Sequence, residues 1–184
     1  IVNTILSNFE NYTTVIKDKS DLNKITENTQ IILILSDPSL SRKKSKILSI
    51  DEHMRIISQS NFFVCMPGVN VPISHHMIEC MLVGTVPITS SYKYFYPELN
   101  NENSIGFFSQ KDLIESIRSA VEMNNEHYEA LQKNIIAYYD QHVSTESFLS
   151  KFNSSDLPSE IFLNVDGGTY DARESRYGFE KKFQ

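Results

Sequence analysis

The chain has 184 residues, of which 40% are hydrophobic and 22% charged, as is ordinary for one globular domain with a hydrophobic core. Its formal net charge of -6 argues against a general nucleic-acid binder, because neutralising a phosphate backbone needs a basic surface. No apolar run approaches the length of a membrane span and we recognise no secretion signal, so we expect a cytoplasmic protein without a membrane span. The chain opens on Ile1 rather than methionine, from which we expect a piece of a longer protein.

The first third of the chain alternates between helix and strand patterns. Apolar residues at helical spacing predict a helix within residues 1–17, and a polar connector follows at 23–30. The continuous apolar run Ile31–Leu35 predicts a strand buried on both faces. Residues 49–52, Ser-Ile-Asp-Glu, form a capping box, which predicts a helix over 50–58.

Residues 60–89 contain the most informative pattern, a strand, a loop, a helix and a second strand. The apolar run Phe62–Cys65 predicts a buried strand, and Ser74 opens a short helix that Gly84 ends in the left-handed conformation. Val86–Ile88 then predicts the next strand. A loop between the carboxyl end of a strand and the start of a helix is where open α/β folds bind ligands that carry phosphate.

The remaining elements continue the alternation. Ile105–Phe108 predicts a strand, Ser109 starts a helix that includes Leu113–Val121, and two further helices carry Tyr128–Tyr138 and Phe148–Phe152. This order predicts an α/β fold: a doubly wound, Rossmann-like parallel sheet with helices on both faces over residues 1–152. Residues 153–184 form an irregular C-terminal extension to which we assign no role.

Several polar side chains gather at the start of the helix that Ser74 opens. Glu79 is a lone acid in an apolar helix, and burying its carboxylate would be costly unless ribose hydroxyls, the backbone or a neighbouring loop bonded to it. Ser74 either caps the helix or donates to a phosphate, and His76 either donates to phosphate oxygens or is simply exposed. His75, and Gly68 and Asn70 in the preceding loop, complete the candidate donor-binding residues; no catalytic base is visible.

This pattern resembles the carboxy-terminal, donor-binding half of a GT-B glycosyltransferase, and most closely the exostosin-like branch. The matching residues are Ser60, Pro67, Gly68, Ser74, His76, Glu79, Gly84, Val86, Pro87 and Ile88. Two departures are His76, where the family usually has arginine, and Pro67, which is displaced by one position. The resemblance continues more weakly through Tyr92 to Phe152.

The resemblance implies a hexosyl- or pentosyltransferase that uses a nucleotide-sugar and a glycan or other hydroxyl acceptor. It also implies an N-terminal GT-B domain in the parent chain, needed for activity, and a Golgi lumen location if that chain is a eukaryotic exostosin relative. Two alternatives remain open. One is an inactive GT-B-like module that binds a nucleotide or another protein. The other is an unrelated doubly wound domain that uses Asp37.

No Asp-x-Asp occurs and no histidines or acids have metal-ligand spacing, so we expect no metal cofactor and a diphosphate bound by helix amides and His76. His53 lies beside the apolar face of its predicted helix and we assign it no role. Cys65 and Cys80 both lie in apolar stretches, which predicts two buried free thiols.

Overall fold

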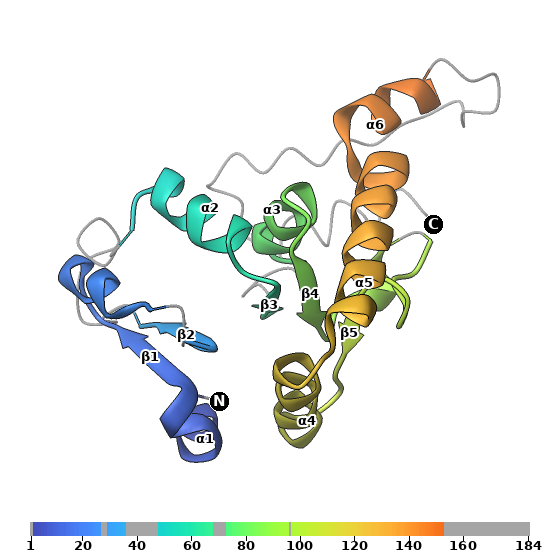
Figure 1. The fold of residues 1–184 in the computed structure, drawn as a ribbon. Coiled ribbons are helices and arrows are strands. Elements are labelled where there is room, and N and C mark those ends of the chain that lie inside the picture. The colour runs from blue at the N-terminus through green and yellow to red at the C-terminus, as the bar shows by residue number, and fades with distance from the viewer. Residues whose placement is uncertain (1, 27–28, 36–47, 68–72, 96, 153–184) are drawn as a thin grey trace, which may run out of the picture.

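The computed structural model describes residues 2–26, 29–35, 48–67, 73–95 and 97–152 (Figure 1). Short 3-10 segments at Glu10–Tyr12, Lys19–Lys24 and Tyr92–Tyr94 and a π-helical turn at Tyr139–Val143 accompany the main elements. The expected C-terminal extension and Gly68, Asn70 and Asp37 lie outside the described residues. The main elements are α1 Val2–Phe9, β1 Thr13–Ile16, β2 Ile31–Ile34, α2 Ile50–Ser58, β3 Phe62–Cys65, α3 His75–Leu82, β4 Val86–Thr89, β5 Ile105–Gly106, α4 Gln110–Val121, α5 Asn125–Tyr138 and α6 Thr145–Phe152.

The fold is α/β, and every strand pairing between described residues is parallel. One sheet has the order β3-β4-β5, with Phe62 opposite Val86 and Ile88 opposite Ile105. The parallel pairing predicted for the segments on either side of the central loop is therefore confirmed. The expectation that residues 31–35 join this same sheet is wrong, because β2 pairs with β1 in a separate two-stranded sheet, with Thr13 opposite Ile31.

The strand β1 lies where the sequence predicted a continuing helix. Helical spacing holds through α1, but the four residues after Tyr12 are Thr-Thr-Val-Ile, a β-branched run that packs better on a pleated sheet than in a helix. Tyr12 and Ile16 continued the apolar spacing by coincidence. The helix prediction was thus correct for α1 and wrong for residues 13–16.

The burial of β2 also differs from expectation. All four of its residues are only half-buried, because the described part of the chain pairs it with one strand rather than two. By contrast, all four residues of β4 are buried between β3 and β5. A continuous apolar run therefore marks a strand correctly but does not show how many neighbours cover it.

Two apolar clusters hold the elements together. In the first, α2, α3 and α5 pack around the sheet through residues such as Ile57, Met81 and Ile135, each with no exposed surface. In the second, Phe9 of α1 packs with Leu113 of α4 and with strand residues. Full burial of such a side chain contributes roughly 1.5–3 kcal/mol, so these contacts fix where α2 and α3 lie.

The predicted helix boundaries are largely confirmed. At α2 the backbone N–H of Glu52 donates to Ser49 Oγ at 3.2 Å, while that of Ser49 donates to Glu52 Oε2 at 2.9 Å, which completes the capping box. Ser109 caps α4 through the backbone N–H of Asp112. Gly84 follows α3 with φ 74°, the left-handed conformation expected there.

The two cysteines are free and buried, as predicted. Cys65 on β3 and Cys80 on α3 place their sulfur atoms 3.6 Å apart. The contact with Cys80, together with burial, raises the pKa of the Cys65 thiol well above its usual range. Both sulfurs therefore behave as small apolar groups that join α3 to the sheet.

Candidate functional site

The amino end of α3 lies beyond the carboxyl end of β3, at the position that the sequence pattern predicted. Ser74 has the extended backbone of an N-cap residue, but its side chain accepts no hydrogen bond from the first turn. Its Oγ is the one buried side-chain polar atom in the described part of the chain that has no hydrogen-bond partner. Ser49, Ser109 and Asn124 do cap their helices, so α3 begins differently from α2, α4 and α5.

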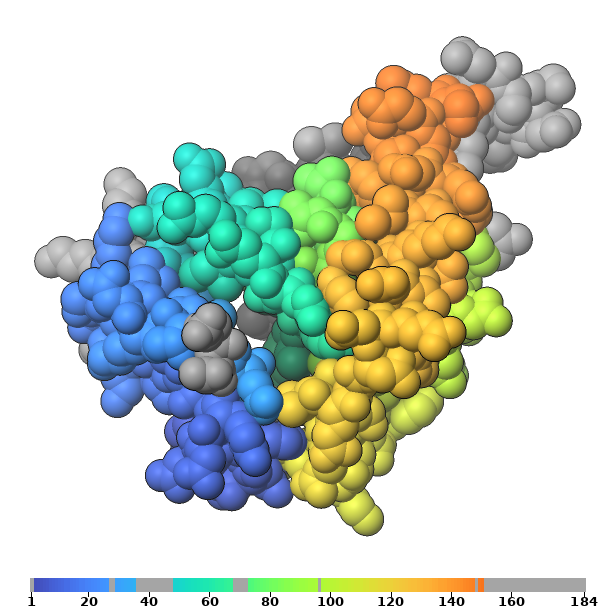
Figure 2. Space-filling view, in the orientation of Figure 1, coloured from blue at the N-terminus to red at the C-terminus, as the bar shows by residue number. Residues whose placement is uncertain are grey.

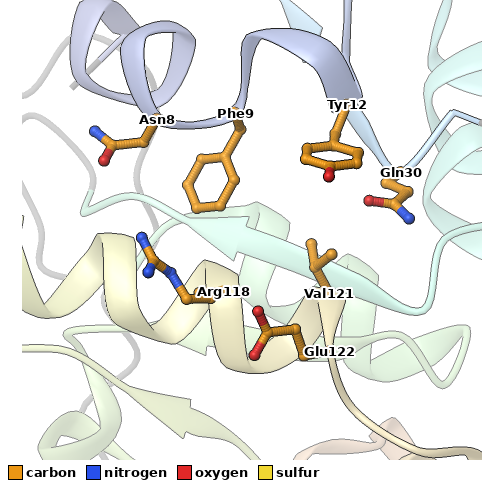
Figure 3. A pocket seen from close by; sticks show the side chains of 7 residues that line it. All are labelled: Asn8, Phe9, Tyr12, Gln30, Arg118, Val121 and Glu122. Carbon is orange, nitrogen blue, oxygen red and sulfur yellow. The ribbon is translucent and has the colours of Figure 1, made fainter.

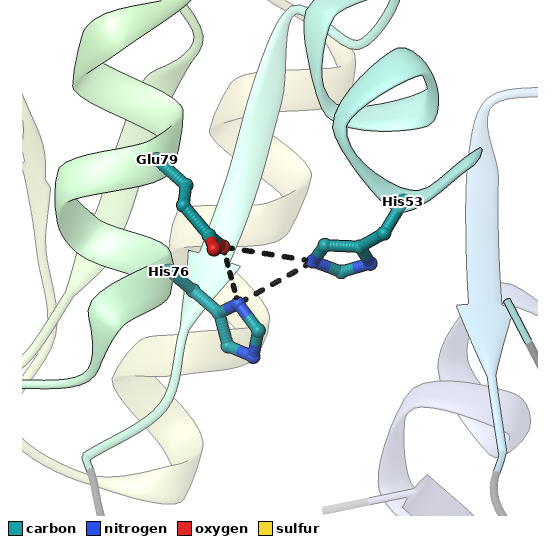
Figure 4. A group of neighbouring side chains, drawn as sticks. All are labelled: His53, His76 and Glu79. Atoms are coloured by element: carbon teal, nitrogen blue, oxygen red, sulfur yellow. Dashed lines mark hydrogen bonds and ion pairs between the residues drawn. The ribbon is translucent and has the colours of Figure 1, made fainter. Parts of the chain in front are cut away.

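His76 and Glu79 lie one helical turn apart on α3 and contact each other. His76 Nδ1 and Glu79 Oε2 are 2.9 Å apart, within hydrogen-bond distance. His53 of α2 completes the group: its Nε2 lies 3.3 Å from His76 Nδ1 and 3.9 Å from Glu79 Oε2 (Figure 4). The side chains of His53, His76 and Glu79 are 25%, 35% and 27% exposed, so the group is partly open to solvent. We call these three residues the His-His-Glu group.

The aromatic ring of Phe63 lies near both histidines of the His-His-Glu group. The ring centroid of Phe63 lies 6.1 Å from that of His53 and 5.8 Å from that of His76. Burial lowers the pKa of His53. The nearby rings of His76 and His75 lower this pKa further, and the carboxylate of Glu79 partly opposes the shift.

The structure brings most of the predicted site residues together. Ser74, His76 and Glu79 lie on the first two turns of α3 or at its cap, and His75 is exposed with its ring centroid 4.0 Å from that of His76. Glu79 contacts two histidines, which satisfies its carboxylate from within the protein. That arrangement favours the structural alternative for Glu79 without testing the ribose role.

Sequence reasoning missed His53. The spacing of His76 and Glu79 by three residues was a signal for a pair on one helix face. Their partner comes from α2, which packs against α3 and lies beside it on the surface (Figure 2). No spacing along the chain shows that contact, so the cluster of three possible ligand groups is not visible in the sequence. The three ligand atoms lie within 4.8 Å of one another and are able to hold a cation.

Two hollows formed by described residues lie elsewhere, between α1 and α4. The first, of about 460 Å³, is lined by Phe9, Tyr12, Arg118 and Glu122 among others (Figure 3). The second runs on along the same helices and shares Asn8 and Arg118 with it. Neither hollow contains any predicted site residue, and the residues lining them form no cluster of catalytic groups. We therefore place the candidate site at α3, on its side-chain chemistry.

Comparison with known proteins identifies no relative: neither a family model nor a curated protein sequence matches the chain. In the ranges that the structure describes, every helix is too short or too polar to cross a bilayer.

Proposed function

We propose that residues 1–152 are the donor-binding domain of a glycosyltransferase that transfers a sugar from a nucleotide-sugar to a glycan or other hydroxyl acceptor. The observation that carries this proposal is the start of α3. A helix without a side-chain cap, whose buried Ser74 hydroxyl has no hydrogen-bond partner among the described residues, follows a parallel strand in a β3-loop-α3-β4 unit. That is the position where α/β folds bind phosphate groups, because backbone N–H groups and the positive end of the helix dipole converge there.

In this proposal each residue has a distinct role. The first amides of α3 and Ser74 Oγ bind the diphosphate, and His76 donates to it where the resembled family has arginine. Glu79 accepts from ribose hydroxyls after exchanging its bond with His76. His75 lies at the rim, and Gly68 and Asn70 belong to the loop before the helix. The acceptor and the catalytic base come from an N-terminal domain of the parent chain.

A second candidate is a GT-B-like module that binds a nucleotide or a protein without catalysis. The pairing of Glu79 with His76 favours it, because a carboxylate already bonded within the protein gains less from a ribose hydroxyl. The enzyme predicts nucleotide binding at α3, and so does the module in its nucleotide-binding form. They differ in sugar transfer by the full parent chain, which only the enzyme carries out.

The test is isothermal calorimetry of the chain with UDP-, GDP- and ADP-sugars in EDTA. We expect one of them to bind, and Glu79→Ala to weaken its binding by about 1–3 kcal/mol, the range for a lost hydrogen bond to a charged group. Glu129→Ala removes an exposed carboxylate on α5 and serves as the control. The proposed donor site is wrong if the chain binds none of the three nucleotide-sugars, or if Glu79→Ala binds as tightly as Glu129→Ala.

A further inference from the structure

The three ligand atoms of the His-His-Glu group have the separations of atoms around one metal ion. His76 Nδ1 lies 3.3 Å from His53 Nε2 and 2.9 Å from Glu79 Oε2, and His53 Nε2 lies 3.9 Å from Glu79 Oε2. Ligands bound at about 2.0–2.1 Å around a tetrahedral ion stand about 3.4 Å apart, in the middle of these values. Three points with these separations lie on a circle of about 2.0 Å radius, so one position exists at bonding distance from all three atoms.

The kind of ligand selects the kind of ion. Two imidazole nitrogens and one carboxylate oxygen form a donor set that zinc uses, with a fourth position left for water or a bound molecule. Mg²⁺ and Ca²⁺ prefer oxygen ligands throughout, whereas imidazole suits zinc, copper, nickel and related ions. The carboxylate of Glu79 also supplies negative charge to offset a divalent ion.

The way the three residues are held supports a built site. His76 and Glu79 are fixed relative to each other by one turn of α3, whose residues Met77, Cys80 and Met81 are fully buried. His53 is held by α2, which is anchored through Ile57. The ring of Phe63 lies near both histidine rings, and the exposed fractions of the three side chains leave an entry path from solvent.

We propose that His53 Nε2, His76 Nδ1 and Glu79 Oε2 form a binding site for one divalent transition-metal ion of the zinc type, with an open coordination position. The ion bridges α2 and α3 and stabilises their packing. This inference does not rest on nucleotide-sugar binding, because the three ligand atoms belong to the protein alone; an ion held by His76 and Glu79 competes with the nucleotide for those two side chains.

The test is titration of the tag-free chain with Co²⁺, followed by its visible absorption and then by displacement with Zn²⁺. We expect one ion per chain, and at least about tenfold weaker binding in each of His53→Ala, His76→Ala and Glu79→Gln, since even the loss of an outer-shell partner of a metal ligand costs that much. Zn²⁺ also raises the melting temperature of the wild type and not that of His53→Ala, because an ion that binds the folded state stabilises it.

His127→Ala is the matched control, because it removes an exposed histidine from α5 and leaves the His-His-Glu group intact. We expect its affinity for Zn²⁺ to equal that of the wild type. The proposal is overturned if wild type and His53→Ala bind Zn²⁺ equally, or if all four variants lose affinity together. In that case the three side chains form only a hydrogen-bonded link between α2 and α3. Nucleotide-sugar titrations in EDTA stay informative under either result, so failure of one proposal is separable from failure of the other.

Discussion

The helices α2 and α3 pack against each other, yet they are stabilised at different places. The first turn of α2 is satisfied by its own side chains, through the reciprocal bonds of Ser49 and Glu52, and Ile57 is its one buried residue. At α3 the cap residue Ser74 makes no such bond, but three side chains are buried: Met77, Cys80 and Met81. Packing therefore holds α3 in place without a side-chain cap, whereas α2 combines a complete capping box with one buried residue.

The carboxyl ends of the two helices continue the contrast. The C-cap residues are alike, Gln59 after α2 with φ -93° and Val83 after α3 with φ -98°. The difference comes one residue later, where Gly84 follows α3 with φ 74°, and a Cβ at Gly84 would lie 2.9 Å from Ile136 Cδ1 on α5. The contacts that stabilise α3 therefore lie at its carboxyl end and in the core, and those that stabilise α2 lie mainly at its amino end.

The largest effect on this comparison is expected from Gly84→Ala. A side chain at positive φ costs about 1–2 kcal/mol, and the crowding with Ile136 adds to it, so we expect a loss of about 1–3 kcal/mol in the free energy of unfolding in urea. Gly106→Ala is the control, because the nearest side-chain atoms to its added Cβ lie 3.9 Å away, and we expect a change within about 0.5 kcal/mol. Equal losses in the two variants would show that α3 does not depend on its end.

The second prediction compares the two caps directly. Ser49→Ala removes a side-chain acceptor and we expect a loss of about 1 kcal/mol in the free energy of unfolding. Ser74→Ala removes a buried hydroxyl that has no partner among the described residues, so we expect no loss and a small gain. Both values come from urea unfolding of the ligand-free chain. If Ser74→Ala loses as much free energy of unfolding as Ser49→Ala, the proposal that only α2 is stabilised by its cap side chain is contradicted.

The smallest effect concerns the charge in the capping box. Lys19 Nζ lies 2.5 Å from Glu52 Oε1. This contact, followed by the hydrogen bonds from Ser49, lowers the pKa of Glu52 from its usual value near 4.5 to about 2. A carboxylate with a lowered pKa stabilises the folded state above its unfolded pKa, and this contribution disappears as the pH falls through the folded value. Glu52→Gln keeps a capping side chain but loses the charge, so it isolates that contribution.

We therefore expect Glu52→Gln to be less stable than the wild type at pH 6–7, and the difference to shrink steadily below pH 4.5. The measurement is the free energy of unfolding of both proteins from pH 7 to pH 3. Glu129→Gln, at an exposed position on α5, is expected to match the wild type throughout. A wild-type advantage that stays constant with pH would mean that the charge of Glu52 contributes nothing.

Features that depend on neighbours along the chain were predictable, and features that depend on packing were not. Ser49 with Glu52, Gly84 and Ser109 signal helix ends through bonds or conformations within a few residues of themselves, and all three signals were correct. The crossover from β3 through α3 to β4 followed from the same local signals.

The errors have two causes. At Thr13–Ile16 the helical spacing of apolar residues masked a local strand signal, the β-branched run, whereas the half-burial of β2 follows from its pairing with one strand. His53 belongs to the candidate site because α2 packs on α3, which brings together side chains 23 positions apart in sequence. At the site itself, His76 and Glu79 were identified from their place on one helix, but their mutual bond and their third partner are properties of the fold.

The buried sulfurs of Cys65 and Cys80 have a kinetic consequence. Their residues are 1% and 0% exposed, and alkylating reagents attack thiolates, so neither sulfur reacts until α3 separates from β3. The rate of alkylation then follows the population of that locally opened state. Any ion or nucleotide that binds the first turns of α3 in the closed state lowers this population and slows the reaction. The alkylation half-time of two thiols outside the site thereby measures how fully the site is occupied.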